Sequence, residues 1–284
     1  MTLLTLLDDY WFGRQVHIPS AALVELLGEF GIGEQAARAA LSRVQRTGML
    51  EGVKQGRRTA YRLSDGAAEA ALVQGRRILR FSAETPSSAL PWDGRWTIIA
   101  YSLAADRADD RRRIRRRLRA LGLAPLQDAL WLSPRPVADR VQRVLDSTEA
   151  VRLNIFEQAV LVGEAAPDVV DAWRLDELRR RYDEVLEQFA ATIERLEAIE
   201  AEPDEAFVTR VETMDTWRPM RRLDPQLPAE LLPQDWPGWE ARRRFAEIHD
   251  RLGEPATARV KEIVARHSDD AADAVWFDTV ADPR

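Results

Sequence analysis

The chain has 284 residues, a formal net charge of -6 at pH 7 and no cysteine. Its length predicts two or three domains, and its 45% hydrophobic and 31% charged residues are typical of folded globular proteins rather than of disordered chains. The lack of cysteine excludes disulfides, cysteine-ligated zinc and thiol catalysis, and the three histidines are too far apart in sequence to suggest a metal site.

Neither a targeting segment nor a membrane span is expected. No run reaches the roughly 18 apolar residues that a spanning helix needs. The apolar stretch "MTLLTLLDDYWF" has no basic region before it and is interrupted by Asp8 and Asp9, which argues against a signal peptide. We therefore expect a cytoplasmic protein.

The first 81 residues predict three helices followed by a hairpin. We expect helices over 2–11, 21–30 and 34–47, with Ser20 as the N-cap of the second, and strands over 49–54 and 58–64 joined by 55–57. Three helices followed by a two-stranded wing is the order of a winged helix-turn-helix, so we place a DNA-binding domain over residues 1–81.

Basic residues are concentrated in this predicted domain. Residues 38–63 contain seven arginines and lysines against Glu51 alone, a net charge of +6 that leaves -12 on the rest of the chain. On the third helix, Ala37, Ala40, Leu41 and Val44 share one face, and the opposite face carries Gln35, Arg38, Ser42 and Arg46. Arg can bond guanine and Gln can bond adenine in a major groove, while Lys54, Arg57, Arg58 and Arg62 of the hairpin would meet the adjacent backbone.

A linker is expected over residues 82–93, followed by a second domain over 94–166. The pattern predicts strands near 94–103, 123–135 (two short ones) and 150–158, with helices near 106–122 and 137–147 between them. This β-α-β-β-α-β order is typical of a ferredoxin-like fold, so the fold class is multidomain α+β.

The arginine-rich helix of this second domain has two interpretations. Arg111–Arg119 either form a solvated or inter-domain face, with Asp106, Asp109 and Asp110 as partners, or they help to hold DNA or an acidic ligand. A metal-dependent nuclease would need a cluster of carboxylates, but the first strand contains no acid and Asp106 lies beyond its end.

Residues 167–284 predict a helical C-terminal domain with an acidic tail. A long helix over 172–201 carries apolar residues at alternating spacings of three and four, so it needs a partner helix, either in the same domain or across a homodimer. Prolines then break the pattern before a final amphipathic helix, and the tail from Ser268 either docks through Trp276 and Phe277 or is mobile.

Three stretches of the chain resemble the PaaX family of bacterial transcriptional regulators. They are "ARAALSRVQRTGMLEGVKQGRRTAYRLSDGA", "WDGRWTIIAYSL" with "RRRLRALGLAPLQDALWLSPR", and "DPQLPAELLPQDWPGWEA", and together they span nearly the whole chain. The resemblance implies a winged-helix N-domain, a central Cas2-like domain, a helical C-terminal domain and a homodimer without enzymatic activity or a cofactor. It assigns DNA contacts to Gln35, Arg38, Ser42, Arg43, Arg46, Lys54, Arg57, Arg58 and Tyr61.

The resemblance also implies a ligand-responsive repressor of an aromatic-acid catabolic operon. Its effector would be phenylacetyl-CoA or another aryl- or acyl-CoA thioester, which releases the repressor from a palindromic operator in double-stranded DNA. Anionic phosphates need basic partners, which suggests Arg218, Arg221 and Arg222 next to Trp217 as an effector site. A Cas2-like nuclease with an accessory DNA-binding domain, a regulator of an unrelated pathway and a protein-interaction scaffold are the alternatives.

Overall fold

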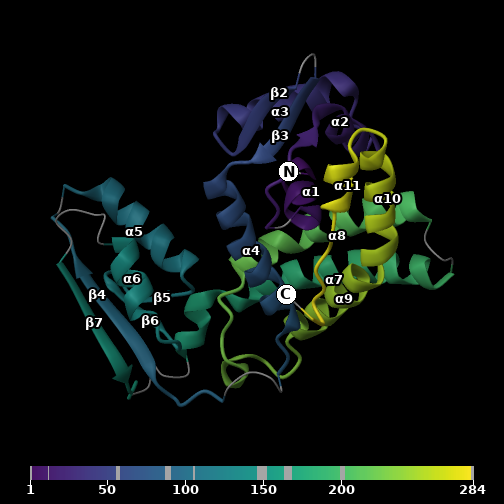
Figure 1. Ribbon diagram of the computed structural model, residues 1–284. Coiled ribbons are helices and arrows are strands. Elements are labelled where there is room, and N and C mark those ends of the chain that lie inside the picture. The colour runs from purple at the N-terminus through teal and green to yellow at the C-terminus, as the bar shows by residue number, and fades with distance from the viewer. Residues whose placement is uncertain are drawn as a thin grey trace. The chain divides into compact units, whose positions relative to one another are not determined.

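A computed structural model describes residues 2–11, 13–55, 58–86, 91–104, 106–145, 152–162, 168–198 and 202–282. Within these ranges the chain has eleven α-helices and two small antiparallel sheets, which confirms the mixed α+β class (Figure 1). It forms two compact units. The first unit comprises residues 1–84, 184–219 and 240–284, and the second unit comprises residues 85–183 and 220–239.

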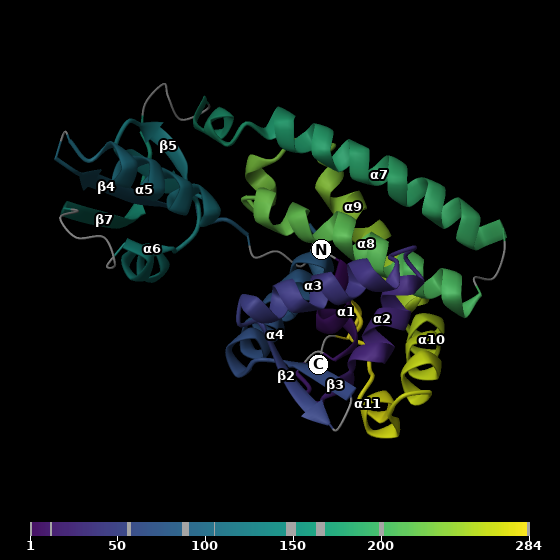
Figure 2. The same cartoon turned by 90° about the horizontal axis from the view of Figure 1, so that it is seen from above.

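The first unit combines the start of the chain with most of its C-terminal half. It contains helices α1 (Thr2–Tyr10), α2 (Ser20–Gly28), α3 (Glu34–Arg46), α4 (Asp65–Ala83), α10 (Gly253–Ala265) and α11 (Asp269–Asp273), and the greater parts of α7 (Leu175–Ala198), α8 (Pro203–Leu223) and α9 (Pro237–Arg251). Figures 1 and 2 show α10 and α11, in yellow, beside the purple helices α1 and α2. Segments more than 200 residues apart in sequence therefore share one core.

Aromatic side chains fill this core. The ring centroid of Trp217 on α8 lies 5.0 Å from that of Phe245 on α9, 5.5 Å from Phe81 on α4 and 6.1 Å from Phe189 on α7. Phe189 belongs to the apolar seam of α7, and other residues of this seam are buried within the chain as well, namely Leu178, Tyr182, Val185, Ile193 and Leu196. The seam is thus packed against its own chain, the first of the two partners expected from its spacing. Phe207 belongs to another part of the core, where its ring packs edge-on against the ring of Tyr10.

A three-stranded sheet completes the first unit. Its strands are β1 (Ile18–Pro19), β2 (Leu50–Gln55) and β3 (Arg58–Leu63), in the order β1-β3-β2 and antiparallel throughout. The hairpin of β2 and β3 was expected, whereas β1 was not. The predicted N-cap was wrong, because Pro19 occupies that position and Ser20 is the first helical residue.

The second unit contains the expected β-α-β-β-α-β order. The elements in this order are β4 (Trp96–Ser102), α5 (Ala108–Ala120), β5 (Ala124–Gln127), β6 (Leu130–Ser133), α6 (Ala138–Leu145) and β7 (Arg152–Ala159). The unit also contains the short 3-10 helices η1 (Asp168–Trp173) and η2 (Ala229–Leu231) and the remaining parts of α7, α8 and α9. The sheet order is β5-β6-β4-β7. Ile114 and Leu118 of α5 and Val141 of α6 pack with Ile99 and Trp131 of the sheet, so both helices cover one of its faces.

The predicted domain bounds at residues 81, 93 and 166 stay predictions. Residues 87–90 of the expected linker and residue 166 lie outside the described residues. Among the described residues, no helix combines the length and the apolar character that crossing a membrane requires.

Candidate nucleic-acid interface

Helix α3 has one buried face and one solvent-exposed face. Ala37 and Leu41 are fully buried, and Ala40 and Val44 are half-buried, because the apolar side of the helix packs against α2. The side chains of the opposite face are exposed, namely Gln35, Arg38, Ser42, Arg43 and Arg46. The two-faced pattern expected from the sequence is therefore present, and it leaves a polar, basic surface about four turns long.

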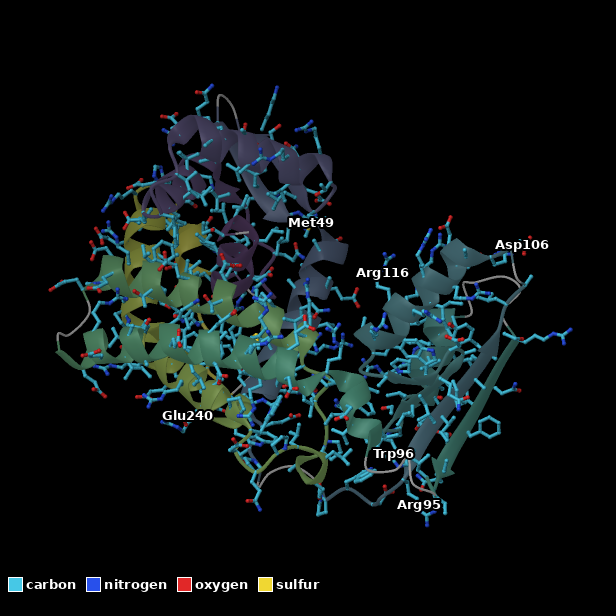
Figure 3. All side chains as sticks on the ribbon, turned by 180° about the vertical axis from the view of Figure 1, so that it is seen from behind. Met49, Arg95, Trp96, Asp106, Arg116 and Glu240 are labelled. Carbon is cyan, nitrogen blue, oxygen red and sulfur yellow. The ribbon has the colours of Figure 1, made fainter. Side chains whose placement is uncertain are left out.

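Glycines end the helices on either side of this surface. Gly31 has a φ of 71° in the turn that leads from α2 to α3, and Gly48 has a φ of 77° just after α3. This left-handed conformation is strained for residues that carry a Cβ, so the two glycines permit sharp turns into and out of α3. Met49 follows directly and is partly exposed on the surface (Figure 3).

The hairpin of β2 and β3 packs closely against α3 at Gly52. A Cβ placed on Gly52 would lie 2.8 Å from Nε2 of Gln45 and 3.1 Å from Cε1 of Tyr61. The half-buried ring of Tyr61 thus covers the strand instead of pointing into solvent. Gln45 was not among the predicted residues, since nothing in the local sequence shows that β2 folds back onto it.

The basic residues of this region differ in their ionic partners. Arg62 donates to Glu51 (2.6 Å), Asp65 (2.9 Å) and the side-chain oxygen of Gln15 (2.6 Å), so its charge is used to join β3, β2 and the start of α4. Arg38, with 56% of its side chain exposed, pairs with Glu34 one turn earlier at 2.8 Å. An exposed pair of this kind contributes only about 0–1 kcal/mol, so a phosphate or base can replace Glu34.

Four exposed cations have no ion pair among the described residues. Arg43 and Arg46 lie on α3, Lys54 lies on β2 and Arg58 begins β3. Arg57, the remaining predicted contact of the hairpin, lies outside the described residues. The described part of the surface therefore offers positive charge on two adjoining elements, α3 and the hairpin.

The arginines of α5 are mostly engaged within the second unit. Asp109 and Asp110 pair with Arg112 and with Arg113, respectively, and the guanidinium of Arg119 lies over the Trp131 ring at 5.5 Å. Arg115 contacts Asp128 at 3.3 Å, and Arg117 donates to the Val144 carbonyl at 2.8 Å. Arg116 is exposed on the same helix (Figure 3). These contacts account for much of the arginine-rich run without a ligand.

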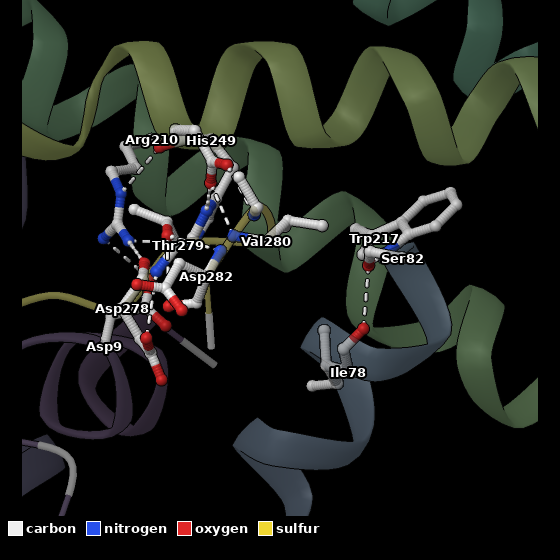
Figure 4. Close-up of polar contacts among 12 residues, drawn as sticks. Asp9, Ile78, Ser82, Arg210, Trp217, His249, Asp278, Thr279, Val280 and Asp282 are labelled. Atoms are coloured by element: carbon white, nitrogen blue, oxygen red, sulfur yellow. Dashed lines mark hydrogen bonds and ion pairs between the residues drawn. The ribbon is translucent and has the colours of Figure 1, made fainter. Parts of the chain in front are cut away.

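The four residues suggested for an effector have different environments. Trp217 is fully buried, and its indole N–H donates to the hydroxyl of Ser82 at 2.7 Å (Figure 4). Arg218 pairs with Asp8 at 2.8 Å, and burial raises the pKa of Asp8 although Arg218 opposes that shift. Arg221 is half-buried and Arg222 exposed, and both belong to the second unit. The effector contact of these residues stays a prediction.

No three His, Asp or Glu side chains among the described residues lie close enough together to hold a metal ion.

Comparisons with known proteins decide the family. Models of the PaaX-like protein, of the PaaX central Cas2-like domain and of the PaaX-like C-terminal domain match residues 2–67, 89–170 and 173–262. The transcriptional repressor PaaX of Escherichia coli K12 is 30% identical over 249 residues, which cover 85% of this chain and 76% of that protein. The chain belongs to the PaaX family.

The fold of this PaaX family member also resembles a solved structure. An uncharacterized protein from Mycobacterium tuberculosis matches it with a TM-score of 0.54 and 23% identity, covering 84% of this chain and 89% of that one. At this identity the similarity concerns the fold alone. The family model places the Cas2-like domain on the β4–β7 region, whose strand and helix order was expected from the sequence.

Proposed function

We propose that this chain is a DNA-binding transcriptional repressor without enzymatic activity, which binds its operator through an N-terminal winged helix-turn-helix. Helices α1 to α3 form the helical part, with α3 as the recognition helix, and the β2–β3 hairpin forms the wing. The observation that carries the proposal is the exposed face of α3, where Gln35, Ser42 and Arg46 lie opposite the buried Ala37 and Leu41. Membership in a family that includes a named transcriptional repressor supports it.

The side chains of this surface suit two kinds of DNA contact. A major groove about 12 Å wide admits a helix, so Gln35, Arg38, Ser42 and Arg46 are positioned to meet base edges. Lys54 and Arg58 of the wing, with Arg43, would bond phosphates and fix the register of the helix. Acidic residues elsewhere in the chain would discourage DNA from binding to other surfaces.

A homodimer on a palindromic operator is part of this proposal. Two α3 helices related by a two-fold axis would enter successive major grooves, about 34 Å apart. The DNA upstream of the chain's own gene is the first candidate for this operator.

DNA binding is tested by fluorescence anisotropy with this upstream duplex and a scrambled duplex of the same length. We expect tighter binding to the upstream duplex, and an affinity that falls steeply as salt is raised from about 50 to 200 mM, because phosphate contacts release counterions. Equal, salt-independent or absent binding to both duplexes would contradict the proposal.

The proposed effector is an aryl- or acyl-CoA thioester such as phenylacetyl-CoA, and the regulated genes would serve aromatic-acid catabolism. The half-buried Arg221 and the exposed Arg222 are the cations proposed for its phosphates. Phenylacetyl-CoA, acetyl-CoA and free coenzyme A are titrated into the complex with upstream DNA. Release by the aryl thioester alone supports this effector, and release by none of them points to a regulator of another pathway.

A further inference from the structure

The last described segment of the chain, Ala274–Asp282, is attached to the first helix. The backbone N–H of Trp276 donates to the carbonyl of Tyr10 at 3.1 Å, and the guanidinium of Arg14 lies 5.6 Å from the centroid of the Trp276 ring. Just before this segment, the Ala271 carbonyl accepts a hydrogen bond from the indole of Trp11 at 3.1 Å. The end of α1 is thus bound to residues about 260 positions later in the sequence.

Asp250 of α9 holds the other end of the segment. Its Oδ1 accepts from the backbone N–H of Val280 at 2.8 Å, and its Oδ2 accepts from that of Ala281 at 3.0 Å. Val280 itself is buried. Hydrogen bonds to an ionised carboxylate are about twice as strong as neutral ones, so one side chain can keep two successive backbone amides in place.

Arg210 of α8 connects all of these parts at the centre (Figure 4). Its side chain is 1% exposed, and its guanidinium donates to the carbonyls of His249 (3.2 Å) and Asp278 (3.5 Å). Nη1 lies 3.6 Å from Oδ2 of Asp9 on α1. The rings of Tyr10 and Phe277 lie over the same guanidinium at 5.3 and 5.7 Å. One buried cation therefore contacts α1, α9 and the C-terminal segment together.

Phe277 also requires a glycine beneath it. A Cβ on Gly253, the first residue of α10, would lie 2.3 Å from Cε2 of Phe277. No side chain tolerates such a distance, and the guanidinium of Arg210 lies 5.7 Å from the centroid of the same ring. The ring thus occupies the space that any other residue at position 253 would fill.

A second set of contacts attaches α2, the helix before α3, to α10 and the residues after it. Arg259 donates to both carboxylate oxygens of Glu29, at 2.9 and 3.2 Å. Glu25 accepts from Arg266 at 2.6 Å and lies 2.7 Å from Nε2 of His267. Since α3 packs on α2, its position depends on α10 as well as on its own sequence neighbours.

We propose that the segment Ala274–Asp282 is a clasp that fixes the position of the DNA-reading helix, and that Asp250, Arg210 and Gly253 are positioning residues for DNA binding. The clasp lies beyond residue 262, where the match to the C-terminal family model ends. Its effect on DNA binding rests on the proposed function. The clasp holds α1 on α8 and α9, and the separate pairs of Glu29 with Arg259 and of Glu25 with Arg266 hold α2 on α10. In a dimer, these two attachments together would set the spacing between the two α3 helices.

Hydrogen–deuterium exchange tests the clasp without DNA. In Asp250→Ala we expect the amides of residues 2–11 and 275–282 to exchange at least tenfold faster than in wild type, while those of β4 and β6 in the second unit are unchanged. Unchanged exchange in residues 2–11 and 275–282, or equally faster exchange in the second unit, would overturn the proposal.

Gly253→Ala tests the contact with Phe277, because here the usual stabilising effect of alanine in a helix should become a destabilising one. Alanine normally stabilises a helix relative to glycine, but here its methyl group would displace Phe277, so we expect faster exchange of the clasp. Gly66→Ala on α4 is the matched control, because a Cβ at that position meets nothing within 4 Å. The double variant Gly253→Ala/Phe277→Ala should exchange no faster than Phe277→Ala alone; additive effects would contradict the contact.

Operator binding tests the positioning role. The two half-sites are first located by footprinting the protein on the upstream duplex. Affinities are then measured for this duplex with both half-sites and for the same duplex with one half-site scrambled. For Asp250→Ala we expect at least a tenfold loss on the paired sites and less than a threefold loss on the single site, with Asp250→Asn between it and wild type. Equal losses on both duplexes would overturn the positioning role. If wild type binds neither duplex, the proposed function fails, and the exchange measurements still decide whether the clasp exists.

Discussion

Arg46 and Arg62 have the same charge and lie 16 positions apart, yet their side chains have different environments in the structure. Arg62 is held by Glu51, Asp65 and Gln15, whereas Arg46 is exposed on α3 with no ion pair among the described residues. The sequence shows that both belong to a basic window, but it contains no sign that Gln15 would fold next to Arg62. The chemical role of each arginine therefore follows from its partners, which only the fold supplies.

At this scale we predict that Arg46→Ala lowers affinity for the upstream duplex by about tenfold or more. A base-reading arginine contributes about 1–3 kcal/mol of discrimination, and truncation would remove the hydrogen bonds by which Arg46 is proposed to read a base. The matched control is Arg143→Ala, an exposed arginine on α6 that has no ion pair among the described residues. Anisotropy titrations that give equal affinities for the two variants would remove Arg46 from the interface.

A buried histidine makes stability depend on pH. Burial, and then the charge of Arg210, lowers the pKa of His249 from 6.5 to about 4. Between pH 6.5 and about 4, this residue is protonated in the unfolded chain but not in the folded chain. Protonation therefore favours the unfolded chain, and the free energy of unfolding decreases as pH falls from 6.5 to about 4.

We therefore predict that His249→Gln is less stable than wild type at pH 7, and that this difference shrinks by up to about 3 kcal/mol by pH 4. Glutamine cannot take up the proton. Asp9, whose pKa burial raises to about 6, titrates in both proteins and largely cancels from the comparison. Urea unfolding at pH 7, 6, 5 and 4 measures the difference; a constant gap would show that His249 does not titrate in this range.

Trp217 shows where residue-level prediction from sequence stops. Its place among Arg218, Arg221 and Arg222 suggested a ligand site, but its ring lies in the core against Phe245 and Phe81. Those rings come from helices far away in the sequence, and a local pattern holds no information about them.

Among the elements, those with regular apolar spacing were predictable. The two faces of α3, the β2–β3 hairpin and all six elements from β4 to β7 were expected close to their observed bounds. Helix α8 was not, because its buried residues include the polar Thr209, Arg210 and Thr213 and because Pro219 lies inside it. Strand β1 has only two residues and exists through its pairing with β3, which a local pattern cannot show.

For the wing we predict that Gly52→Ala destabilises the first unit by about 1 kcal/mol, the lower end of the usual cost of overpacking, because Gly52 and Gln45 are exposed. Its methyl group would displace the flexible amide of Gln45 and press on the half-buried ring of Tyr61, 3.1 Å from the new Cβ, which loosens the contact between the hairpin and α3. Weaker DNA binding should accompany the loss of stability. Gly28→Ala is the control, since a Cβ there meets nothing within 4 Å. Thermal unfolding that shows the same effect for both variants would contradict the close packing of the wing.

On the scale of the whole molecule, the first unit is assembled from distant segments. The sequence suggests separate domains at residues 1–81 and 167–284, whereas the core of the N-terminal helices includes Phe207, Trp217 and the segment around Trp276. Sequence patterns identify which faces are apolar, but they do not show which faces meet.

We accordingly predict that residues 1–84 expressed alone do not form a stable fold. Tyr10, Trp11 and Phe81 would lose Phe207, Ala271 and Trp217 as partners, which exposes a large apolar surface to water. Amide proton spectra of this fragment should show poor dispersion, and the full chain serves as the control. A well-dispersed spectrum of the fragment would show that the N-terminal part folds independently.

The central claim, that the exposed face of α3 reads operator DNA, is tested most directly by one comparison. Affinity for the upstream duplex and for a scrambled duplex is measured for wild type, for Gln35→Ala/Ser42→Ala/Arg46→Ala, and for the control Gln142→Ala/Arg143→Ala on the exposed face of α6. We predict that the α3 variant loses its preference for the upstream duplex and keeps only weak, salt-dependent binding, while the control behaves as wild type. An α3 variant that retains the wild-type preference would contradict the claim.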